Sequence, residues 1–494
     1  MEDLLNWPRT IVADLVRDPV RGPIRASRLR MQVERGFDVH TQYSGIDGPR
    51  ECCHRLGLEI GADSAWRFLS AADRLRKSRA FIMGLNASCG DTHSCVFGSF
   101  DERIAPAAAL QLQTLLDGLE GKHGADKELA ILDIARWLAE DRQAIFPSGQ
   151  TAACYAHGGG QCLAAPPSST SRARWSIAGF TCTAYSRAGK QNRGADRSEV
   201  DRAIWMAERM ALADRGEEAG FLAECVTHFP TGEMLRDPMA STHDIVWVHT
   251  GPREMGFPAE RPRMFAAGIA KCPSREGDQL VWCGPEDQAE VQREFDTIFN
   301  KRVVLDGSIF FQAPAHVRDE SYRAKLALRG SFPAPECDLS TDPEIFDMLL
   351  PPGAAQRLES FMQLGGSCIC DVEHWPRRGY DKLSRTFPIQ LTHGTIVDIR
   401  TNGRHTLALG TEHLCAQGFP MFPVTGSPSL SLLSPHLASL PEVDQKFFSG
   451  NGIFIPAFSA WMLYVWSNLT CVRSIVFRPL GIPEPDDLDH EHEL

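Results

Sequence analysis

Two segments decide the fold: RWSIAGFTCTAYSRAGKQNRG at residues 174–194 and GFLAECV at residues 220–226. The apolar runs Trp175 to Phe180 and Gly220 to Val226 have the length of buried strands. Between them, from Ser198 onward, apolar residues recur at the three- and four-residue steps of an amphipathic helix, at Val200, Ile204, Ala207 and Ala211. Strand, helix and strand in this order predict one βαβ unit with parallel strands.

This unit makes Cys182 and Glu224 the candidate catalytic residues. In a doubly wound parallel sheet, ligands bind outside the carboxyl ends of the strands. Cys182 follows the carboxyl end of the first strand, and Glu224 lies near that of the second. We therefore expect a thiol and a carboxyl group to face one crevice.

The residues around both side chains resemble the catalytic core of the cytosine-5 DNA methyltransferases. Phe180-Thr181-Cys182-Thr183 is similar to the family's Pro-Pro-Cys-Gln, and Glu224-Cys225-Val226 to its Glu-Asn-Val. Further similar segments follow in the family's order between residues 37 and 465. The resemblance implies an α/β fold of the Rossmann-like, SAM-dependent methyltransferase class, with a doubly wound, mostly parallel sheet and a smaller target-recognition domain.

The resemblance also implies a site for S-adenosylmethionine (SAM). The turn Ser44-Gly45-Ile46-Asp47-Gly48-Pro49 resembles the family's Phe-x-Gly-x-Gly-Gly loop, with Asp47 in place of one glycine. Asp73 ends the next predicted strand, where an acidic residue can bind a ribose diol. Ser99 stands where the family has the aspartate that meets the adenine amino group, and Asn451 belongs to a closing Gly-Asn motif. The expected SAM-binding residues are Tyr43, Ser44, Gly45, Gly48, Asp73, Ser99 and Asn451.

The family chemistry assigns a role to each catalytic candidate. A Cys182 thiolate would add to carbon-6 of cytosine and make carbon-5 nucleophilic. Cysteine suits this step because its free pKa of about 8.5 makes the thiolate accessible near neutral pH. Glu224 would donate a proton to ring N3. GFPAERPRMF resembles Gly-x-Pro-Gln-x-Arg-x-Arg, so Arg261 and Arg263 are candidates for contacts with cytosine and phosphate. The base would be flipped out of the duplex.

The composition is that of a globular protein with one large and one small domain, or a large insertion. The net charge of −12 is unfavourable for a DNA enzyme, since phosphate contacts supply most non-specific affinity. Part of this charge lies in the tail after Ile482, which has six acidic residues and no Lys or Arg. A surface for DNA, or for RNA, should therefore be a local patch.

Five consecutive regions are expected along the chain. An N-terminal extension over the surface (1–36) precedes a catalytic SAM-binding domain (37–290), which contains a helical and then loop-like insertion at about 103–173. A target-recognition region (291–400), a C-terminal return to the catalytic domain (401–480) and an acidic tail (481–494) follow. Within the recognition region, basic residues gather near Trp375 and Tyr380 as a candidate phosphate-tracking surface: Arg377, Arg378, Lys382 and Arg385.

No metal site is predicted. Cys154, His157 and Cys162 are suitable ligand types, but no fourth ligand accompanies them in their loop. Fifteen cysteines and an N-terminus without a signal-peptide layout favour an intracellular, reducing compartment, the nucleus in a eukaryote. No run approaches the roughly 18 apolar residues that span a bilayer, so no membrane contact is expected. Protein partners are not indicated.

The predicted function is methyl transfer from SAM to carbon-5 of DNA cytosine. Two alternatives stay open: an RNA cytosine methyltransferase, and a catalytically degenerate protein that keeps the fold as a binding module. Four departures from the family pattern bear on activity, namely Phe180-Thr181 for Pro-Pro, Thr183 for Gln, Cys225 for Asn and Ser99 for Asp. None of them removes Cys182 or Glu224, which favours an enzyme.

Overall fold

The structure is a computed structural model, and it describes residues 6–91, 93–167, 172–180, 184–185, 193–273, 278–332, 339, 343–376, 384–400, 405–422 and 431–473. Cys182 therefore lies outside the described residues, as do Arg377, Arg378, Tyr380, Lys382 and the acidic tail.

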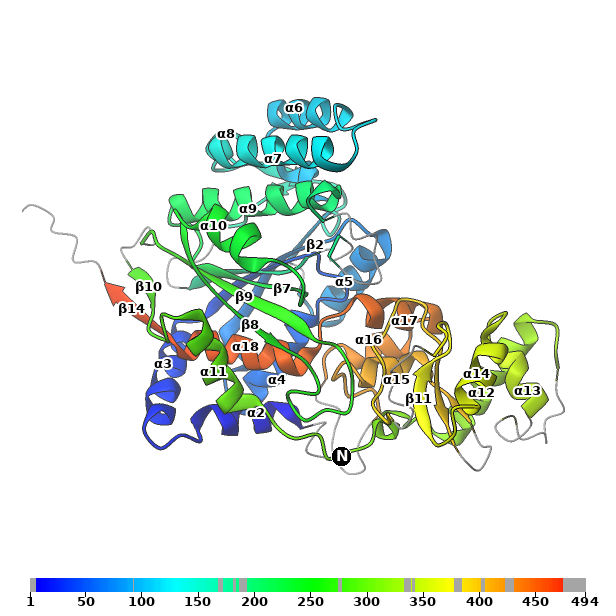
Figure 1. The fold of residues 1–494 in the computed structure, drawn as a ribbon. Coiled ribbons are helices and arrows are strands. Elements are labelled where there is room, and N and C mark those ends of the chain that lie inside the picture. Colours follow the sequence, from blue (N-terminus) through cyan, green and yellow to red (C-terminus); the bar gives the residue numbers. More distant parts are fainter. Residues whose placement is uncertain are drawn as a thin grey trace, which may run out of the picture.

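A seven-stranded sheet forms the centre of the molecule, in the order β3–β2–β1–β6–β7–β9–β8 (Figure 1). Its strands are β1 (Phe37–Gln42), β2 (Trp66–Ala72), β3 (Cys95–Phe97), β6 (Ala173–Gly179), β7 (Gly220–Val226), β8 (His243–Thr250) and β9 (Arg263–Ala270). β9 runs antiparallel to β7 and to β8, while β3, β2, β1, β6 and β7 pair in parallel. The doubly wound, mostly parallel α/β class is thus confirmed.

Helices cover both faces of this sheet (Figure 1). On one side lie α2 (Trp7–Val16), α3 (Arg21–Arg35), α4 (Gly48–Ile60), α11 (Gln288–Phe299) and α18 (Ile455–Ser467). On the other lie α9 (Ser198–Asp214) and α10 (Asp237–Met239), and outside them α6 (Pro106–Asp117), α7 (Gly124–Glu140) and α8 (Arg142–Ile145). Because α7 packs on α9, the segment expected as an insertion forms an outer layer that buries most of α9.

A smaller lobe has its own hydrophobic core, made by residues such as Tyr322, Leu326, Phe346, Leu358 and Ile399. It contains α12 (Ala315–Leu328), α13 (Pro343–Leu349), α14 (Ala354–Met362), β11 (Cys368–Asp371), β12 (Ile396–Ile399) and β13 (Thr406–Leu407). The chain then returns through α15 (Gly410–Cys415), α16 (Ser434–Ala438) and α17 (Glu442–Asn451), which lie between the lobe and α5 (Arg76–Ser88) in Figure 1. β10 (Asp278–Trp282) pairs separately with β14 (Leu469–Arg473).

The expectation that residues 1 to 36 extend over the surface is wrong. Both α2 and α3 pack against α18. Trp7, Ile11 and Leu15 recur every four residues, so one apolar face of α2 is buried. The indole Nε1 of Trp7 donates a hydrogen bond to the carbonyl of Gly418 at 3.1 Å. High Arg and Pro content concealed this periodicity.

The loop-like part of the expected insertion also differs from expectation, because it contains a short antiparallel hairpin of β4 (Thr151–Ala153) and β5 (Gln161–Leu163). Within the described ranges, no helix combines the length and the apolar character that a membrane-crossing segment needs.

Replacing Trp7 with alanine should lower the free energy of unfolding by about 3–5 kcal/mol, because it leaves a cavity between α2 and α18 and orphans the Gly418 carbonyl. Ile24→Ala, at a half-exposed position of α3, is the matched control and should change stability little. Chemical denaturation measures both. Equal midpoints for Trp7→Ala and wild type would show that α2 does not belong to the core.

Candidate functional site

A cavity of about 780 Å³ opens at the carboxyl ends of the parallel strands. Its walls are the turn after β1, the segments after β2 and β3, the ends of β6 and β7, and residues 450–453 ahead of α18. Ten residues that the sequence singled out line it: Tyr43, Ser44, Gly45, Gly48, Asp73, Ser99, Glu224, Arg261, Arg263 and Asn451.

A second cavity, of about 430 Å³, lies at the opposite, amino ends of the strands, beside Arg174 and Ala219. Doubly wound sheets bind their ligands at the carboxyl ends. The larger cavity is therefore the candidate site.

The turn after β1 has an unusual backbone. Tyr43, Gly45 and Asp47 all have positive φ angles, of 52°, 56° and 59°. Such conformations cost free energy in residues other than glycine and concentrate at ligand-binding loops. The turn is fastened to the end of β2, since Ser44 Oγ hydrogen-bonds the backbone of Ala72 and Asp73 Oδ2 accepts the Gly45 N–H at 2.8 Å.

Asp47 adopts the left-handed conformation that a glycine would supply, which a short polar side chain tolerates. Its buried carboxylate points away from the cavity and pairs with Arg50 Nε at 2.9 Å. Burial raises the pKa of Asp47, and Arg50 opposes that shift. On the cavity side, Gly45 and Gly48 have open space within 4 Å of where a Cβ would stand. The aspartate therefore leaves the backbone approachable.

Glu224 and Arg263 form a mostly buried ion pair in the cavity wall. Arg263 Nε lies 2.8 Å from Glu224 Oε1, and the side chains are 11% and 9% exposed. Sheet register creates this pair, since Arg263 begins β9 opposite Val226, the last residue of β7. On the other side of β7, Gly179 pairs with Glu224, and the Phe180 N–H donates to the Glu224 carbonyl at 2.9 Å. Cys182 follows Phe180 by two residues.

Arg261, which lines the cavity, is held by main-chain carbonyl groups. The side chain is buried, and its guanidinium donates to the carbonyls of Gly450, at 3.1 Å, and Gly452. These two residues flank Asn451, which shares the cavity with Gly45. We infer that Arg261 holds this loop in place.

Asp73 and Ser99 stand at the ends of β2 and β3. The two Asp73 carboxylate oxygens accept the backbone N–H groups of Gly45 and Leu75, each at 2.8 Å, and burial raises the pKa of Asp73. Ser99 Oγ lies 3.2 Å from Glu102 Oε1.

Two further carboxylates in the cavity wall, those of Asp101 and Asp201, were not predicted from the sequence. Asp101 follows Ser99 by two residues in CVFGSFDER, so that segment contained a signal for it. Asp201 lies on α9, 3.0 Å from Arg197, and burial raises its pKa. The aromatic wall residues Phe447 and Phe448 precede the Gly-Asn motif and carried no separate signal.

Arg385 does not behave as expected for a member of the phosphate-tracking cluster. Its guanidinium is bonded to Asp306, at 2.7 Å, and to Asp398, so it braces the smaller lobe. Trp375 is half-exposed, and the remaining members lie outside the described residues.

Two substitutions at Asp47 should separate its two contributions to stability. Asp47→Gly keeps the positive φ but leaves buried Arg50 with only its longer contact to Asp91, at 3.5 Å, which should cost about 1–3 kcal/mol. Asp47→Ala also loses the ion pair and in addition has a Cβ that disfavours the positive φ, so it should be less stable than Asp47→Gly by about 1 kcal/mol. At exposed Gln111, in the middle of α6, the order should reverse, because glycine is the weaker helix former. Chemical denaturation of the four variants checks this, and a common order at both sites would contradict the strained turn.

No protein-family model matches this chain, and no curated protein does. Three solved structures each align with 87% of this chain. A DNMT2 triple mutant from Spodoptera frugiperda has 11% sequence identity over 100% of its own chain and a TM-score of 0.41. The methyltransferase EhMeth from Entamoeba histolytica has 10% identity over 98% of its chain and a TM-score of 0.39, and the Dnmt2 methyltransferase of S. pombe has 12% identity over 97% of its chain and a TM-score of 0.38. With identities this low, function has to follow from the residues of the cavity.

Proposed function

We propose that this chain is a SAM-dependent cytosine-5 methyltransferase that acts on DNA. The observation that carries the proposal is that one cavity collects side chains from segments up to about 400 residues apart that resemble that family, from Gly45 to Asn451. Chance similarity of short motifs would not bring them to one edge of one sheet.

The cavity fits SAM in three respects. Its volume is within the range of small-molecule sites. The open faces of Gly45 and Gly48 let a ligand approach the backbone closely. Asp73 stands at the end of β2, and a carboxylate has about four acceptor positions, of which backbone N–H groups use two. When bound there, SAM would supply the methyl group that carbon-5 of cytosine receives.

The pair of Glu224 and Arg263 would recognise the cytosine ring. Arg263 engages Oε1 of Glu224, so Oε2 would meet ring N3, while the guanidinium would lie near the exocyclic oxygen. Once protonated, Glu224 would donate to ring N3 and balance the negative charge that develops when a nucleophile adds to carbon-6, and it would regain that proton when the ring is restored. We assign that nucleophile to Cys182. After the methyl group has transferred to carbon-5, loss of the carbon-5 proton to a solvent base and departure of the Cys182 thiolate would restore the ring.

Duplex DNA that contains 5-fluorocytosine should become covalently attached to Cys182 in the presence of SAM, because fluorine cannot leave as a proton does. Cys182→Ser should abolish the adduct, since a hydroxyl is scarcely ionised near neutral pH. Glu224→Gln should slow its formation by roughly 10²–10⁴-fold. Denaturing gels and peptide mass mapping measure the adduct, and Cys283→Ser, at an exposed cysteine, is the matched control.

The same probe in RNA decides the substrate. An adduct with RNA alone would replace DNA by RNA in the proposal. No adduct with either nucleic acid, from protein that binds S-adenosylhomocysteine, would identify a binding module instead. An adduct at another cysteine would overturn the assignment of the nucleophile.

The two arginines should have separable effects. Arg261→Ala removes charge-assisted hydrogen bonds worth about 1.5–3 kcal/mol that fasten the Gly450–Gly452 loop, so affinity for S-adenosylhomocysteine should fall roughly 10-fold or more. Arg263→Ala should leave this affinity nearly unchanged but slow adduct formation. Titration calorimetry and the trapping assay measure the two quantities. Parallel losses in both variants would show that neither role is specific.

A further inference from the structure

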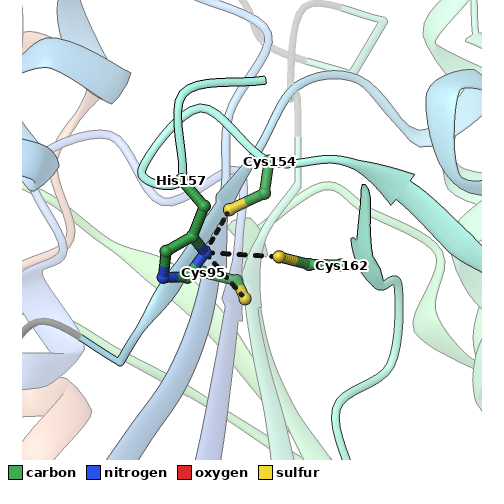
Figure 2. Close-up of side chains that lie close together, drawn as sticks. All are labelled: Cys95, Cys154, His157 and Cys162. Atoms are coloured by element: carbon green, nitrogen blue, oxygen red, sulfur yellow. Dashed lines mark hydrogen bonds between the residues drawn. The ribbon is translucent and has the colours of Figure 1, made fainter. Parts of the chain in front are cut away.

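Four potential metal ligands meet beside the edge strand β3, at a site separate from the cavity (Figure 2). The ligand atoms of Cys95, Cys154, His157 and Cys162 all lie within 4.8 Å of one another. Nδ1 of His157 faces the three sulfur atoms, at 3.2 Å from Cys154, 3.3 Å from Cys162 and 3.9 Å from Cys95. Three of these residues lie close together in the sequence, and Cys95, from β3, adds the fourth.

These separations match a tetrahedral site. With Zn–S bonds of about 2.3 Å and Zn–N bonds of about 2.0–2.1 Å, neighbouring ligand atoms of a tetrahedron are about 3.5–3.8 Å apart. The three sulfur–nitrogen distances bracket that range. Three thiolates and one imidazole are also a donor set that zinc takes in structural sites, and hard cations such as Mg²⁺ or Ca²⁺ prefer oxygen ligands.

The chain forms this arrangement through a turn built for it. Cys154 and His157 lie in the short loop that joins β4 to β5, and Cys162 follows on β5, all within the segment CYAHGGGQC. Gly158 and Gly159 have φ angles of 65° and 84°, which lets the backbone reverse directly after His157. The Cys154 N–H donates to the Gly160 carbonyl at 2.9 Å and closes the turn.

Main-chain contacts fix this turn against the sheet. The Tyr155 N–H donates to the Val96 carbonyl at 2.8 Å, and the Val96 N–H points to the Cys154 sulfur at 3.4 Å. An N–H group directed at a ligand sulfur is the kind of outer contact that orients metal ligands. Cys95 and Cys154 are buried, Cys162 is half-buried and His157 is exposed, so an ion could enter from the solvent side.

We propose that Cys95, Cys154, His157 and Cys162 bind a single Zn²⁺ ion with a structural role. Four protein ligands complete the tetrahedron and leave no position for water or substrate, which distinguishes this site from a catalytic one. The ion would join the β4–β5 hairpin to the edge of the central sheet. Gly98 and Ser99, directly after β3, line the large cavity, so the ion would also steady one wall of it. The zinc site does not depend on the proposed methyl transfer.

The first experiment measures metal in the full-length chain, purified without chelator, by inductively coupled plasma mass spectrometry. One zinc ion per chain is expected. His157→Ala and Cys162→Ser, at the two more exposed positions, should each lower this content, and the double variant should abolish it. Cys272→Ser and Cys283→Ser change exposed cysteines elsewhere and should keep the full content.

Cobalt replacement tests the ligands themselves. Wild-type protein loaded with Co²⁺ should show thiolate-to-cobalt charge-transfer absorption, and Cys162→Ser should lose about a third of its intensity, since one of three thiolates is gone. Chelation of the zinc should lower the Tm of wild type by several degrees and leave that of the double variant unchanged.

Should the variants fail to fold, titration of wild type with a thiol reagent still decides, because zinc should be released as three thiols react. Three outcomes would overturn the proposal: wild type that takes up no zinc from a stoichiometric solution, full zinc content in the folded double variant, or a disulfide between two of the three cysteines in freshly purified protein.

Discussion

The rest of the fold is arranged around α18, because all thirteen residues of this helix are buried and neighbouring elements must cover them. A helix that is apolar on every side needs partners on every side. β9 lies on one side, where Trp461 Nε1 donates to the Ala266 carbonyl at 3.1 Å, and α2, α3 and α4 lie on the others. The N-terminal helices are therefore part of the core. Since α4 and α18 pack together, the two loops that lead into them, at residues 43–49 and 450–453, face the same cavity.

The opposite end of the sheet is held by buried charges. Glu208 on α9 pairs with Arg103 at 3.2 Å and with Arg209 at 2.7 Å, and Arg209 also pairs with Glu218, which accepts a hydrogen bond from Ser176 at 3.0 Å. Burial lowers the pKa of neighbouring Arg174 to about 10. Loss of one partner from such a network strands a charge, a far larger penalty than loss of a surface pair. Arg103 thus fixes the start of the inserted segment to α9. Contacts between the cysteine and histidine cluster and β3 fix the later part of the same segment to the sheet.

Strong periodicity made the central βαβ unit predictable: β7 has the predicted bounds, α9 begins at Ser198 as expected, and β6 begins two residues before the predicted strand and ends one residue before its end. Long-range pairing was not predictable. Cys95 precedes Cys154 by 59 residues, and the sequence pattern around Cys95 indicated only a strand. The side chain of Asp47 turns away from the cavity because Arg50 lies one helical turn on, which a motif comparison does not reveal. Cys182 stays a prediction, since it lies outside the described residues.

Under the proposed function, charge in the cavity wall bears on where a nucleic-acid backbone would bind. Four arginines line the cavity (Arg74, Arg197, Arg261 and Arg263), and four carboxylates oppose them (Asp73, Asp101, Asp201 and Glu224). Two of the arginines are already engaged inside, by loop carbonyls and by Glu224. The interior is therefore suited to a neutral base rather than to phosphate. Arg74 and Arg197, whose side chains are 67% and 45% exposed, pair with Asp201 at 3.8 and 3.0 Å where the cavity meets solvent. Under the proposed function, affinity for phosphate would come from these rim cations, because an exposed ion pair stabilises little and can give way to a phosphate contact.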